Sequence, residues 1–108
     1  MPSHFGKRFD NALRRLRQGL PLGVPLEVKT VPPEKIAGLC GLCWTFEDPD
    51  KFEVQVSREL SILAAVDTLI HEYAHCLDHV VNGTDSRKEH RNSWGVAYAK
   101  CYRAVHKE

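Results

Sequence analysis

The sequence predicts a small α+β protein, with about three helices and a short, mostly antiparallel sheet of about three strands. Three observations lead to this class. The 108 residues suffice for a single core, so we expect residues 1–108 to form one domain. Apolar residues recur at three- and four-residue steps in three segments, as they do on one face of a helix. Shorter segments between the first two of these alternate apolar and polar residues, as half-buried strands do.

The first expected helix covers residues from about Ser3 to Gly19. Its apolar stripe consists of Phe5, Phe9, Leu13, Leu16 and Leu20. Ser3 is a candidate N-cap, and Gly19 followed by Pro21 is typical of a helix end. The remaining positions carry a group of cations: Lys7, Arg8, Arg14, Arg15 and Arg17. We interpret these cations as a solvated face, and a weak contact with DNA phosphates is the alternative interpretation.

Three strands are expected after this helix. Residues 24–31 alternate apolar and polar side chains, and Pro25 favours the start or the edge of a sheet. Residues 39–46 are the second candidate, and residues 52–56 are the third. The segment 47–51 between them has the acidic, proline-containing composition of a turn. The last two strands are therefore predicted to form a hairpin.

The second expected helix begins at Arg58 or Leu60 and ends at Asn82-Gly83, because glycine tolerates the left-handed conformation of a helix end. Its apolar positions are Leu63, Val66, Ile70, Tyr73, Ala74, Leu77 and Val81. The last helix is expected from about Arg91 to His106. Its apolar face consists of Trp94, Ala97, Tyr98, Cys101 and Val105. We expect the sheet to pack on the second helix, with the first and last helices around it.

The second helix carries His71-Glu72-Tyr73-Ala74-His75, which has the pattern His-Glu-x-x-His. Histidines at this spacing lie one turn above each other, so both imidazoles can converge on one Zn²⁺, each nitrogen about 2.0–2.1 Å from the metal. Glu72 falls between them and can reach a zinc-bound water as a general base. We therefore predict a zinc site with His71 and His75 as ligands and Glu72 as the catalytic residue.

A catalytic zinc site usually has a third protein ligand. The downstream candidates are His79, Asp85, Glu89, His90 and His106. An unbroken helix places His79 two turns from His71, about 12 Å along the axis, which is too far for one metal. Glu89 would give a His-His-Glu set, and His90 would give three histidines. The metzincin pattern is excluded, because Asp78 and Val81 stand where that pattern requires glycine and histidine.

Two stretches together resemble the SprT-like metallopeptidases, a family that includes the Spartan proteases acting on DNA–protein crosslinks. The first is Asp67-Thr68-Leu69-Ile70-His71-Glu72-Tyr73-Ala74-His75, and the second is His90-Arg91-Asn92-Ser93-Trp94 after a glycine-containing loop. The family pattern has a third histidine a little over a dozen residues after the helix motif, followed by a bulky aromatic one turn later. The resemblance covers about Ile36 to Cys101 and is to a minimal version of the domain, without the C-terminal zinc ribbon of many members.

This resemblance implies a zincin-like metallopeptidase domain in which His71, His75 and His90 hold Zn²⁺. It implies a hydrolase, a zinc protease that cleaves the peptide bonds of a protein or peptide substrate through a zinc-activated water, with Glu72 as general base. A non-catalytic zinc-binding adaptor on the same fold, which binds protein or nucleic acid, is the alternative.

The cysteines are not expected to bind metal. Cys40-Gly41-Leu42-Cys43 is a single C-x-x-C, and its two side chains point to opposite faces of an extended strand. We predict buried or partly buried thiols there, and core thiols at Cys76 and Cys101. Asp78 is interpreted as a surface carboxylate, with orientation of a ligand imidazole as the alternative. His79 is interpreted as a solvated histidine or as a neighbour of a ligand.

Composition limits the partners. The formal net charge is +1, from 15 basic and 14 acidic residues, so the whole chain does not favour nucleic acid. No apolar stretch is long enough to cross a membrane, and the first residues lack the apolar run of a signal peptide. We therefore expect a cytoplasmic protein with no membrane partner, whose cysteines are thiols rather than disulfides.

Overall fold

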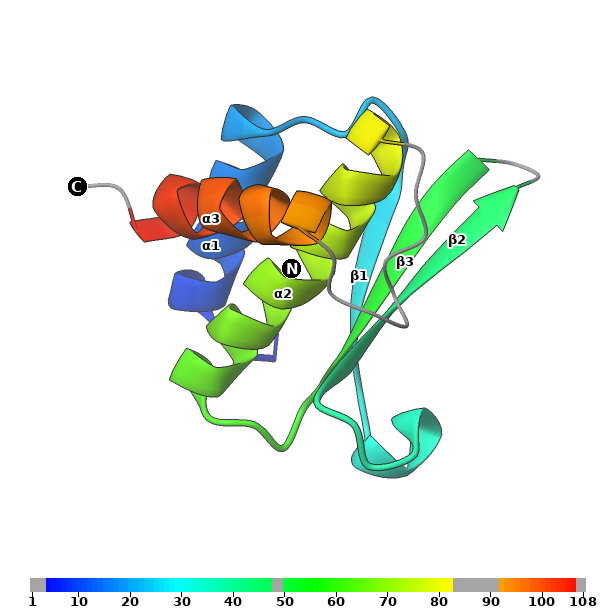
Figure 1. Cartoon of the computed structure of the whole chain (residues 1–108). Coiled ribbons are helices and arrows are strands. Elements are labelled where there is room, and N and C mark those ends of the chain that lie inside the picture. Colours follow the sequence, from blue (N-terminus) through cyan, green and yellow to red (C-terminus); the bar gives the residue numbers. More distant parts are fainter. Residues whose placement is uncertain (1–3, 48–49, 83–91, 107–108) are drawn as a thin grey trace.

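The computed structural model describes residues 4–47, 50–82 and 92–106. Their elements, in chain order, are α1 (Lys7–Gly19), β1 (Leu26–Val31), the 3₁₀ helix η1 (Pro33–Ile36), β2 (Gly41–Glu47), β3 (Asp50–Ser57), α2 (Ile62–Asn82) and α3 (Asn92–His106). The sheet lies on one side of α2, and α1 and α3 lie on the other (Figure 1). The predicted α+β class is confirmed. None of the described helices is both long and apolar enough to cross a membrane.

The sheet is mixed, and β3 lies between the other two strands. The predicted hairpin is confirmed, because β2 and β3 pair antiparallel with Cys43 opposite Val54. The β1–β3 pair is parallel, with Val28 opposite Val54, and this pair was not anticipated. Successive strands run in opposite directions, so β1 and β3 point the same way. Because β3, and not β2, lies beside β1, this pair is parallel.

Helix α2 is the central element of the fold. It packs against the sheet, α1 and α3. Tyr73 in its middle is fully buried, and its hydroxyl donates a hydrogen bond of 2.6 Å to the carbonyl oxygen of Leu20. Two cations of α1 donate hydrogen bonds to other elements. Arg15 donates to the Val105 carbonyl of α3 at 2.7 Å, and Arg17 donates to the Leu26 carbonyl of β1 at 2.8 Å. The cationic face of α1 therefore has structural contacts as well as solvent exposure.

The helix boundaries and faces need some corrections. Helix α1 begins at Lys7 and not near Ser3, because Gly6 takes a φ of 82°, outside the helical region; Ser3 itself lies outside the described residues. Leu63 and Val81 are exposed, at 65% and 64%, although both were expected on the apolar face of α2. They lie near the two ends of this 21-residue helix, whereas the packed side chains lie in its middle. Gly83, the predicted helix end, is outside the described residues.

Gly41 marks the closest approach between the sheet and α2. A Cβ atom at this position would lie 2.6 Å from the Thr68 Cγ2 atom and 2.9 Å from the Gln55 carbonyl oxygen. Both distances are shorter than van der Waals contact. The absence of a side chain at Gly41 therefore allows β2 to lie beside the α2 turn that carries Glu72, whose Cγ would be 3.4 Å from the same Cβ.

Gly41→Ala is expected to lower the free energy of unfolding by about 1–3 kcal/mol, the usual cost of overpacking. Urea unfolding followed by circular dichroism measures it. The matched control is Gly95→Ala, where a Cβ would meet nothing within 4 Å and alanine favours the helix. Adding Thr68→Ser removes the methyl group at 2.6 Å and should restore part of the loss. Equal stabilities for the two alanine variants would contradict this role of Gly41.

Candidate metal centre

The two histidines of the motif lie on one face of α2 and approach each other closely. Their Nε2 atoms are 3.2 Å apart, and their ring centroids are 4.9 Å apart. His75 is buried, whereas the His71 side chain is 35% exposed. The pair therefore has one imidazole anchored in the core and one at the wall of an open cleft.

This geometry fits a shared zinc ion. Two nitrogens at about 2.0–2.1 Å from one tetrahedral zinc are separated by about 3.3 Å. The observed separation of the Nε2 atoms, 3.2 Å, is close to that value. The same distance also fits a hydrogen bond between the two rings, and imidazoles that are unprotonated at Nε2 would each offer a lone pair to the metal.

The third predicted ligand lies outside the described part of the chain. His90, its alternative Glu89 and the further candidate Asp85 all fall within residues 83–91. Among the described residues, no group of three or more histidines, cysteines or acidic residues is placed to hold a metal. Of the predicted site residues, the structure places His71, Glu72 and His75 close together, and His90 lies outside the described residues.

Glu72 is buried beside this pair. Its residue is 8% exposed, and its Oε2 atom lies 4.0 Å from the His71 Nε2 atom. Burial raises the pKa of the Glu72 carboxyl to about 7, because the charged form loses hydration. A carboxyl group with a pKa close to neutral can both accept and release a proton under physiological conditions.

Trp94, at the start of α3, covers the histidine pair. Its ring centroid is 5.0 Å from that of His71 and 5.4 Å from that of His75, with an interplanar angle of 31° to the second. Such contacts restrict the rotation of both imidazoles. They also bring the start of α3 against α2 at the motif itself.

These residues open onto a cleft of about 460 Å³ between β2, α2 and α3. We call it the metal cleft; its walls include Leu39, Cys40, Gly41, Thr68 and Tyr98 as well as His71, Glu72 and Trp94. This volume is within the range of small-ligand sites, about 300–1,000 Å³. Since β2 is an edge strand of the sheet, the cleft lies at a sheet edge.

The cysteine predictions are correct in part. Cys76 and Cys101 are buried as expected, and burial raises the pKa of the Cys101 thiol to about 12. Cys43 is buried, but Cys40 is exposed, because the two side chains point to opposite faces of the chain. The structure adds a contact that the sequence did not indicate: the Sγ atoms of Cys43 and Cys76 are 2.8 Å apart, and this hydrogen bond raises the pKa of the Cys76 thiol.

Asp78 and His79 differ in their surroundings. Asp78 is fully buried, so the prediction of a surface carboxylate was wrong. The reason is that α2 is covered on several sides and its polar positions are not all at the surface. His79 is half-buried, with its ring edge-on to Phe52 at a centroid distance of 5.8 Å.

Comparisons with known proteins identify no relative. No family model matches the chain, and neither the curated proteins nor the solved structures contain a significant match.

Proposed function

We propose that this protein is a zinc-dependent metallopeptidase with a zincin-like, SprT-like domain. The observation that carries the proposal is the Nε2 separation of 3.2 Å between His71 and His75, beside a buried glutamate that opens onto the same cleft. When bound, zinc would polarise the scissile carbonyl and acidify water. The fold, the cleft and the thiol-rich chain are compatible with a cytoplasmic hydrolase of this kind.

Glu72 acts as the general base. Its carboxylate accepts a proton from the attacking water and then delivers it to the nitrogen of the leaving amine. The burial of Glu72 beside the histidine pair, with its Oε2 atom 4.0 Å from the His71 Nε2 atom, supports this role. Trp94 keeps the two imidazoles oriented and shields one side of them from solvent.

His90 is the proposed third ligand, on the resemblance to the SprT-like pattern. The contact of Trp94 with both imidazoles supports it, because the described start of α3 at Asn92 then lies near the pair. His90 precedes Asn92 by two residues, and two steps between Cα atoms span at most about 7.6 Å. Glu89, one residue further, remains the alternative ligand.

Hydrolysis of an unfolded protein substrate tests the proposal. The zinc-loaded protein is expected to generate new peptide termini, which mass spectrometry detects. Removing the metal with a chelator should abolish the cleavage, and stoichiometric zinc should restore it. A protein that retains zinc but never cleaves would contradict the peptidase and favour the zinc-binding adaptor.

A further inference from the structure

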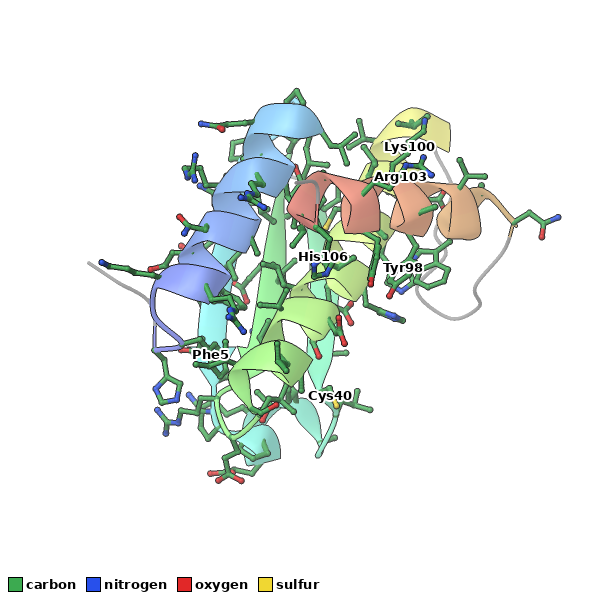
Figure 2. All side chains as sticks on the ribbon, turned by 90° about the vertical axis from the view of Figure 1, so that its left-hand side faces the viewer. Phe5, Cys40, Tyr98, Lys100, Arg103 and His106 are labelled. Atoms are coloured by element: carbon green, nitrogen blue, oxygen red, sulfur yellow. The ribbon has the colours of Figure 1, made fainter. Side chains whose placement is uncertain are left out.

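A row of rings leads away from the metal cleft along α3. Trp94, Tyr98, Tyr102 and His106 occupy every fourth position, and we call them the ring row. Successive ring centroids are 5.1, 6.2 and 4.4 Å apart. Tyr98 and His106 lie on one side of α3, and Lys100 and Arg103 lie on the other (Figure 2). The row is accessible to a ligand, since Tyr102 is 46% exposed.

The ring row ends at a second and larger hollow of about 860 Å³, between α1, α2 and α3. We call it the basic groove. Its lining combines apolar side chains with two cations and one carboxylate: Ala12, Leu63, Val66 and Val105, with Arg8, Arg15 and Asp67. Leu63 is 65% exposed there. The Arg15 guanidinium donates a hydrogen bond to the Val105 carbonyl, which holds it in the groove lining.

The metal cleft and the basic groove are neighbouring hollows that share one lining residue. Asp67, on α2 one turn before His71, lines both. Its carboxylate raises the pKa of the Tyr98 phenol, although burial of that phenol is the larger cause. Along the ring row, Arg8 and Arg15 line only the basic groove, whereas Asp67 lines both hollows.

The length of the row sets the size of such a ligand. Trp94 and His106 are twelve residues apart, which is about 18 Å along a helix. An extended peptide gains about 3.3–3.6 Å per residue, so about five or six residues cover this distance. Aromatic rings are enriched where proteins bind other chains, and arginine binds carboxylates through paired hydrogen bonds.

We propose that the ring row and the basic groove bind the substrate peptide on one side of its scissile bond. The basic groove takes an acidic residue about five or six residues from that bond. This inference rests on the proposed peptidase function, and it defines the substrate class: extended segments with an acidic residue about five or six residues from the cut, where Arg8 and Arg15 line the groove.

Peptide binding tests the inference without requiring turnover. The zinc-loaded Glu72→Gln protein is titrated against fluorescein-labelled peptides, with either a Glu-Glu or a Gln-Gln pair near one end. Fluorescence anisotropy should show the Glu-Glu peptide binding about three- to tenfold more tightly, as expected for partly exposed ion pairs. Arg8→Glu should abolish this preference, and Tyr102→Ala should weaken both peptides.

The matched control is Lys100→Glu, which makes the same change of charge on the opposite side of α3. It should leave the preference intact. Equal binding of the two peptides, or equal losses in the Lys100 and Arg8 variants, would overturn the inference. Stronger binding of a single-stranded oligonucleotide that Arg8→Glu abolishes would overturn it in favour of nucleic acid.

The wild-type protein separates this inference from the proposed function. Cleavage of an unfolded substrate with no enrichment of acidic residues near the cut sites would refute the inference and leave the peptidase standing. A selective preference for the Glu-Glu peptide in a protein that never cleaves would refute the peptidase and support the same surface as a peptide-binding site.

Discussion

Glu72→Gln is expected to lower the rate of peptide hydrolysis by about 10²–10⁴-fold, the usual contribution of a general base. Glutamine is nearly isosteric with glutamate, but its amide cannot accept the proton of the attacking water. The fold and the zinc content should not change, because Glu72 is not among the proposed ligands. Single-turnover cleavage of an unfolded substrate measures the rate, and metal analysis of the same sample measures the zinc content.

The control for this substitution is Glu59→Gln. Glu59 is exposed and precedes α2, outside the metal cleft, so its variant should cleave at the wild-type rate. If the Glu72 variant cleaves as fast as the Glu59 variant with zinc bound, Glu72 is not the base. If it loses its zinc, the loss of activity says nothing about proton transfer, and the ligand set must be revised.

His90→Ala is expected to weaken zinc binding by more than about 100-fold. Removing a residue that only hydrogen-bonds to a metal ligand can already cost up to about 100-fold in metal affinity, and removing the ligand itself should cost more. Loss of one of three protein ligands leaves His71 and His75 alone, and their geometry favours zinc but does not close the site. Competition with a chromophoric chelator measures the affinity.

Glu89→Ala and His79→Ala are the controls for the third ligand. His79 packs on Phe52 and should be neutral for zinc. Retention of zinc by His90→Ala together with its loss from Glu89→Ala would establish the His-His-Glu set instead. In that case the resemblance to the SprT-like pattern would not extend to the third ligand.

Local periodicity predicted much of the fold. The helix and strand segments and the hairpin followed from patterns within about 20 residues, which depend on local geometry alone. The parallel pairing of β1 with β3 did not follow, because residues 26–31 and 50–57 meet only after η1 and β2 have intervened. Burial of Asp78 also depends on three partners of α2 that the sequence does not place.

The candidate site likewise has features that the sequence predicted and features that it did not. His71, Glu72 and His75 belong to one helix, so their spacing alone predicted their proximity. The contact of Gly41 with the α2 turn and the approach of Cys43 to Cys76 join β2 to α2 across the core. For the contact of Gly41 with α2, the only sequence signal was the presence of a glycine inside an expected strand, which is typical of a close backbone approach.

Anomalous diffraction at the zinc edge, from crystals of the zinc-loaded protein, tests the proposed metal centre most directly. We expect one peak per chain, bound by the Nε2 atoms of His71 and His75 and by His90, with Glu72 facing the open coordination position. A peak at the Cys40-Gly41-Leu42-Cys43 segment, or a histidine pair that binds no metal at stoichiometric zinc, would contradict the assignment of this cleft as the metal centre.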